Sequence, residues 1–207
     1  MNHQAKPSAL KNHNRLVLTG IASLALVACS AASIAPEEPP LAGADIGGPF
    51  ELVNSAGETV RWADFRGEYA IVYFGYAFCP DICPTDMQRM TQALKELSER
   101  QPELTAKIQP IFITIDPERD TREVVDEFTN AFSDDVVGLT GSPEQVKVAA
   151  DNFRVYYSKG EATPEGGYLV DHSNIVYLFD PDGAPLATLP TDEGPDAVAA
   201  EIEKWVS

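Results

Sequence analysis

The chain has 207 residues, 44% of them hydrophobic, which is enough to form one domain with a substantial core. It carries 32 acidic and 15 basic residues, a formal net charge of −17. This negative charge argues against nucleic acid as a partner and against docking on anionic lipid through charge.

The N-terminal residues 1–28 resemble a secretory signal peptide, because basic residues precede an apolar run too short to span a membrane comfortably. The run ends in "LVAC", which resembles the bacterial lipobox. We therefore expect a lipid on Cys29, a flexible linker over 29–44, and a location on the periplasmic side of a bacterial cell envelope, anchored to the inner membrane. The alternative is an ordinary signal peptide that leaves Cys29 as a free thiol.

Residues 45–207 are predicted to form the folded domain. Strands are expected where apolar residues run continuously, and helices where they recur every three or four positions. In chain order we expect a hairpin (49–68), a strand (69–77), a helix (84–100), a strand (107–116), a helix capped by Thr121, a short apolar piece (136–140), a helix (143–152), a loop (160–170), two strands (173–180 and 185–189) and a last helix (195–206). This alternation predicts an α/β fold with a central mixed β-sheet flanked by helices, preceded by an N-terminal β-hairpin extension.

A cysteine pair, Cys79 and Cys83 in "CPDIC", follows the first buried strand directly and precedes a helix, as in the thioredoxin-like fold. A helix start stabilises a thiolate, so the pair suits redox chemistry. On a helical turn the two Cβ atoms would be about 6 Å apart, wider than a disulfide prefers. That spacing suits two thiolates that bind one soft metal ion. They would select Cu(I) most readily, with zinc as the chief competing ion. A static disulfide remains open in an exported protein.

The mature part of the chain has one histidine, His172, just before a predicted buried strand. The thioredoxin-like topology places this loop beside the cysteines, so His172 is either a third metal ligand or an ordinary hydrogen-bonded histidine. Its neighbour Asp171 is either an acceptor in the second shell of the site or a solvated loop acid.

Other polar and sulfur-bearing residues have structural interpretations. Met87 and Met90 lie in an apolar helical stripe and are expected in the core. Asp116 and Asp120, in "TIDPERDT", are expected to be turn or capping residues.

Three motifs together, "GYAFCPDICPTDM", "ITIDPERDT" and "YLVDHSNIVYLFDPDG", resemble the Sco/SenC family of thioredoxin-fold copper proteins, which serve cytochrome c oxidase assembly. The resemblance implies copper, as Cu(I), Cu(II) or both, bound by Cys79, Cys83 and His172. It also implies delivery of that copper to the CuA-bearing subunit of the oxidase, or reduction of that subunit's cysteines. Further implied partners are another periplasmic copper chaperone or a thioredoxin-like reductant, and the membrane through the lipid anchor.

The main alternative is a thiol:disulfide reductase that does not carry copper. Exported reductases of this kind usually have WCxxC and a proline before the late strand, whereas this chain lacks the tryptophan and has His172 and its neighbours there. A thiol peroxidase would have threonine three residues before the reactive cysteine, where Tyr76 stands.

Overall fold

The computed structural model describes residues 37–162 and 167–207. Cys29 and the expected signal peptide lie outside these ranges, so lipidation and cleavage stay predictions. The first described residues contact the domain: the Leu41 N–H donates to the Leu186 carbonyl (2.9 Å), and Lys204 pairs with Glu37 (2.7 Å). None of the helices in the described ranges is long and apolar enough to cross a membrane.

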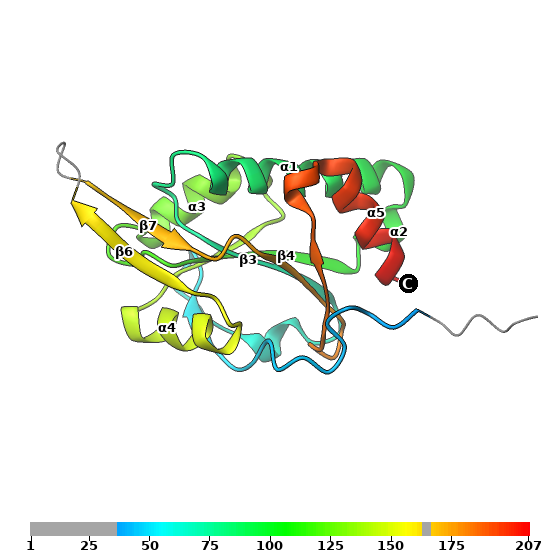
Figure 1. The fold of residues 1–207 in the computed structure, drawn as a ribbon, viewed down its shortest axis with the longest axis horizontal. Helices are drawn as coiled ribbons and strands as arrows, with labels where there is room; N and C mark the ends of the chain where they lie inside the picture. Colours follow the sequence, from blue (N-terminus) through cyan, green and yellow to red (C-terminus); the bar gives the residue numbers. More distant parts are fainter. Residues whose placement is uncertain (1–36, 163–166) are drawn as a thin grey trace, which may run out of the picture. The chain divides into compact units, whose positions relative to one another are not determined.

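The centre of the domain is a five-stranded sheet in the order β5-β4-β3-β8-β9 (Figure 1). The two inner strands, β3 (Tyr69–Gly75) and β4 (Ile108–Thr114), are parallel and largely buried on both faces, which explains their continuous apolar sequences. Antiparallel β8 (Val176–Phe179) and β9 (Pro185–Leu189) extend the sheet on one side, and parallel β5 (Val137–Leu139) on the other. The predicted mixed α/β sheet is therefore confirmed.

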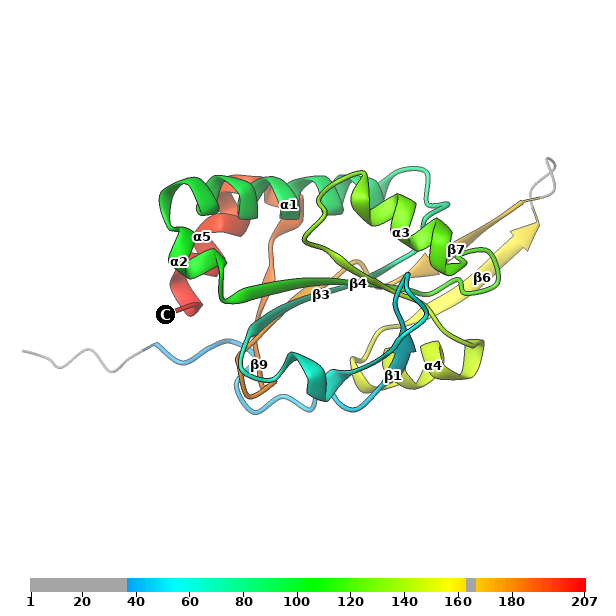
Figure 2. The ribbon, with the colours of Figure 1, turned by 180° about the vertical axis from the view of Figure 1, so that it is seen from behind.

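Helices cover both faces of this sheet, as the two opposite views show (Figures 1 and 2). One face carries α1, α3 and α5, and the other carries α4 with the N-terminal hairpin. Their bounds are α1 Ile82–Arg100, α2 Pro102–Thr105, α3 Arg122–Asn130, α4 Pro143–Asn152, α5 Pro195–Trp205, β1 Glu51–Val53 and β2 Thr59–Arg61, with 3₁₀ turns at Trp62–Phe65 (η1) and Thr191–Glu193 (η2). Thr121 caps α3 as predicted, its side chain accepting from the Val124 N–H.

The core contains the residues that the sequence pattern places there. Met87 and Met90 are fully buried, so their prediction as core residues is confirmed. On the α4 side of the sheet, the ring of Phe153 packs against those of Trp62 and Phe179, with centroid distances of 5.2 and 5.3 Å. These aromatic contacts join α4, η1 and β8 into one layer.

One predicted loop is wrong. Residues 160–170 contain the end of β6 (Tyr157–Ala162) and the start of β7 (Tyr168–His172), which pair as a separate antiparallel hairpin. This hairpin extends past the end of the central sheet (Figure 1). Its sequence is polar and glycine-containing, because most of its side chains are only partly buried, and so it lacks the apolar pattern of a strand.

Candidate metal centre

The structure brings the three predicted ligands together. Cys79 lies in the loop between β3 and α1, Cys83 in the first turn of α1, and His172 at the end of β7. One ligand atom from each lies within 4.8 Å of the other two. Cys83 Sγ and His172 Nε2 are within hydrogen-bond distance, at 3.4 Å.

The expectation that both cysteines lie on one helical turn is wrong, since α1 begins at Ile82 and Cys79 precedes it. Instead the loop folds back, and the Cys83 N–H donates to Cys79 Sγ at 3.4 Å. The last residue of β3 makes room for this arrangement: a Cβ on Gly75 would lie 3.1 Å from Cys83 Sγ. Both cysteines are free thiols in the structure, so the static disulfide of the sequence interpretation is not formed.

The two sulfurs differ in protonation. The pKa of Cys79 is lowered to about 3, chiefly because the Cys83 side chain donates to its sulfur, while burial opposes this. The His172 side chain and the backbone N–H groups of Asp81 and Cys83 lower it further. The same pairing, together with burial, raises the pKa of Cys83 above its usual value. At neutral pH the site therefore holds a thiolate at Cys79 and a thiol at Cys83.

His172 is oriented by the backbone. Its Nδ1 lies 2.9 Å from the Ser173 carbonyl, which as an acceptor requires the proton on Nδ1 and leaves the Nε2 lone pair facing the sulfurs. The ring also packs edge-on against Tyr76, at 6.0 Å between centroids. Asp171 is exposed, and strand alternation puts it on the opposite face of β7. Its role in the second shell stays a prediction.

A buried polar group lies next to Cys83, and sequence reasoning missed it because it joins residues far apart in the chain. The Tyr73 hydroxyl is within hydrogen-bond distance of Asp86 Oδ2 (3.1 Å) and Asn174 Oδ1 (3.3 Å). Burial, with Cys83 and Asp86 nearby, raises the pKa of Tyr73, so it remains a neutral donor. Asp86 Oδ1 is buried without a hydrogen-bond partner in residues 37–162 and 167–207. Tyr73 thus connects the first turns of α1 to the segment after His172.

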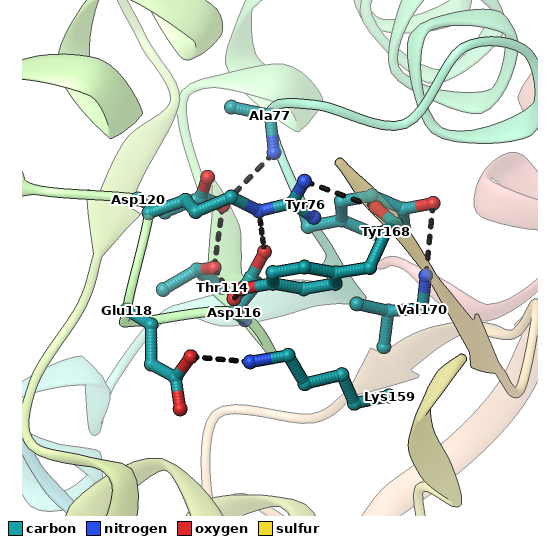
Figure 3. Close-up of polar contacts among 10 residues, drawn as sticks. Tyr76, Ala77, Thr114, Asp116, Glu118, Asp120, Lys159, Tyr168 and Val170 are labelled. Carbon is teal, nitrogen blue, oxygen red and sulfur yellow. Dashed lines mark hydrogen bonds and ion pairs between the residues drawn. The ribbon is translucent and has the colours of Figure 1, made fainter. Parts of the chain in front are cut away.

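The segment Asp116–Asp120 contacts Ala77, two residues before Cys79, and Tyr168 on β7 (Figure 3). Asp120 is fully buried and accepts from the Ala77 N–H (2.9 Å) and the Thr114 hydroxyl (2.6 Å), and burial raises its pKa. Asp116 accepts from the Tyr168 hydroxyl at 2.7 Å. The expectation that these aspartates are turn residues is confirmed, since the N–H groups of Arg119 and Asp120 donate to the Asp116 carbonyl. Their side chains have a further role that was not expected, because they hold distant parts of the site.

The donor set fits a soft metal ion. Two sulfurs and an imidazole nitrogen are the ligands that Cu(I) and zinc accept. Bonds of about 2.0–2.3 Å place two ligand atoms at most roughly 4.6 Å apart around one ion. The separations here reach up to 4.8 Å. A small side-chain movement therefore suffices for all three residues to bind the same ion.

Comparison with known proteins identifies similar chains. A family model described as SCO1/SenC matches residues 38–207. Mouse "Protein SCO2 homolog, mitochondrial" is 44% identical over 136 residues, 66% of this chain and 52% of that protein. Human "Protein SCO1 homolog, mitochondrial" is 40% identical over 159 residues, 76% of this chain and 52% of that protein. The chain thus spans about half the length of these curated relatives.

Solved structures of SCO proteins are also similar to this chain. The crystal structure of Arabidopsis thaliana ScoI with copper bound has a TM-score of 0.71 and 36% identity, covering 77% of this chain and 97% of that one. The predicted thioredoxin-like fold is confirmed by this match. The predicted bacterial, periplasmic, lipid-anchored location is contradicted, because these curated relatives are mitochondrial proteins.

Proposed function

Since the chain belongs to the SCO1/SenC family, we propose that it binds one copper ion as cargo and passes it on during cytochrome c oxidase assembly. The observation that carries this proposal is the convergence of Cys79, Cys83 and His172 from two separate parts of the chain. Solved relatives with copper bound support copper over zinc. The proposed recipient is the CuA-bearing subunit of the oxidase.

The residues of the site suit loading and release. Cys79 is already a thiolate, whereas Cys83 gives up its proton to solvent when copper is bound, so loading releases a proton. Cys79 is 9% exposed and Cys83 is inaccessible, which makes Cys79 the sulfur nearer to a partner's thiolates.

Copper then passes to the acceptor by exchange of ligands, with each thiolate of the acceptor replacing one thiolate of this chain. Oxidation of the pair to a disulfide removes both thiolates and therefore prevents loading.

A second candidate is reduction of the oxidase cysteines without copper as cargo. The low pKa of Cys79 beside a second thiol favours this reading, because a thiolate is the species that attacks a disulfide. Reduction needs both cysteines and makes no use of an imidazole. His172 therefore distinguishes the two functions.

The test uses cells that lack the endogenous protein and receive either the wild-type chain or His172→Ala. We expect the wild type to restore the CuA signal of the isolated oxidase, and His172→Ala, which keeps both thiols, to restore only a small part of it. Added copper should raise the signal of the variant. Full restoration by His172→Ala would support the reductase, and restoration by Cys79→Ser/Cys83→Ser would contradict both functions.

A further inference from the structure

The hairpin that carries His172 is a two-stranded sheet of its own, whereas the cysteines follow β3 of the central sheet. Strand pairing within the central sheet therefore does not set the distance between the histidine and the two sulfurs. The short link from His172 to β8 and the contacts between the hairpin and the rest of the domain set it instead.

Arg119 makes the most extensive of these contacts. Its Nη1 donates to the Tyr168 carbonyl on β7 (3.0 Å), and its guanidinium carbon lies 3.6 Å from the centroid of the Tyr168 ring. Its Nε donates to Asp116 (2.5 Å), which in turn accepts from the Tyr168 hydroxyl. Arg119, Tyr168 and Asp116 thus form a closed set of contacts, and a planar cation stacked on an aromatic ring has a defined orientation.

Two further contacts attach the hairpin nearby (Figure 3). The Val170 N–H donates to the Tyr76 hydroxyl at 3.2 Å, and Lys159 pairs with Glu118 at 2.6 Å. The Lys159 pair is exposed on both sides and contributes little. The Arg119 side chain is only 23% exposed, so its contacts with Tyr168 are shielded from water.

The neighbouring residue holds the other half of the site. Asp120 accepts from the Ala77 N–H, two residues before Cys79, and the Thr140 hydroxyl donates to the Asp120 carbonyl. Two adjacent residues of one segment therefore connect the two halves. Asp120 hydrogen-bonds to the cysteine loop, and Arg119 hydrogen-bonds to the hairpin. The Arg119 guanidinium also lies 5.1 Å from the centroid of the Phe78 ring, next to Cys79.

We propose that Arg119 is a positioning residue for the copper site, which acts through Tyr168 to hold β7 where His172 can meet Cys79 and Cys83. This inference rests on the proposed function. Without Arg119 the hairpin moves away, and copper remains on the two sulfurs alone. Arg119 is therefore expected to act on copper binding mainly through His172, because its hydrogen bond outside its own segment goes to the hairpin, whereas it meets the cysteine loop only through the more distant rings of Tyr76 and Phe78.

A double-mutant cycle tests this dependence, using Cu(I) affinity measured anaerobically against a chromophoric chelator. Arg119→Gln should weaken binding about tenfold, as loss of a supporting residue does elsewhere. In the His172→Ala background the same substitution should change affinity less than about twofold. Asp120→Asn, on the cysteine side of the same segment, should weaken binding in both backgrounds. Arg100→Gln, which removes an exposed pair with Glu203, is the control and should change nothing.

Hydrogen exchange of the metal-free protein provides a second measurement beside the double-mutant cycle. In the apo protein, Arg119→Gln should speed hydrogen exchange of the Val170 amide and leave the β3 amides unchanged. Arg119→Lys, which keeps the charge without the planar stack, should show the same pattern more weakly and replaces Arg119→Gln should that variant fail to fold.

Equal losses of affinity in both backgrounds, or no loss with His172 present, overturn the positioning role. Failure of the wild-type chain to bind copper overturns the proposed function instead, and that result does not depend on Arg119.

Discussion

Replacing Cys83 with serine is expected to abolish tight copper binding while the domain remains folded. The substitution removes one of two thiolates, and a serine hydroxyl is a poor ligand for a soft ion at neutral pH. The loss should exceed the roughly 100-fold upper end seen for supporting residues, because a direct ligand is lost. Serine is close to cysteine in size, so the close approach of Gly75 to this position creates no clash.

Copper retained after loading one equivalent and passing the protein over a desalting column measures this effect. Thermal unfolding of the apo protein checks the fold. Cys29→Ser is the matched control, because it replaces the cysteine outside the pair, 50 positions before Cys79 in the sequence, and should leave copper retention unchanged. Stoichiometric copper on Cys83→Ser would show that Cys83 is not a ligand.

The alkylation rate of Cys79 is expected to be nearly flat between about pH 5 and 8. Its pKa is lowered to about 3, so the reactive thiolate predominates throughout this range and is lost only as the pH falls toward 3. An ordinary thiol with a pKa of about 8.5 would react about 1,000-fold faster at pH 8 than at pH 5, tenfold per unit. Iodoacetamide labelling of the reduced apo protein, followed by mass spectrometry of the Cys79 peptide, gives the profile.

The Cys83→Ala variant, which has no side-chain donor at this position, is the control for the cause of this shift. Cys83 is the largest contributor to the low pKa of Cys79, so its removal should restore a rate that rises with pH. A wild-type rate that rises tenfold per unit from pH 5 would mean that Cys79 is protonated in the folded protein.

The central strands could be predicted because β3 and β4 are buried on both faces and therefore carry continuous apolar runs. The metal ligands could be predicted from the sequence for a different reason. The two cysteines are close in sequence, and His172 is the only histidine after residue 13, so few combinations of ligands are available. Local patterns and residue chemistry sufficed for both.

The β6–β7 hairpin and the residues that support the site could not be predicted in this way. The hairpin has little apolar periodicity, since the domain buries only part of it. The contacts of Arg119 with Tyr168 and of Tyr73 with Asn174 join residues 49 and 101 positions apart. Side-chain contacts over such separations depend on the completed fold, and one sequence gives no local signal for them.

The convergence of two sulfurs and one imidazole on a single ion is the central claim. X-ray absorption at the copper K-edge, on the reduced chain loaded with one equivalent of Cu(I), tests it most directly. We expect a first coordination shell of two sulfurs and one nitrogen, with the nitrogen absent in His172→Ala. A shell without two sulfurs, or a nitrogen that persists in His172→Ala, would contradict the site.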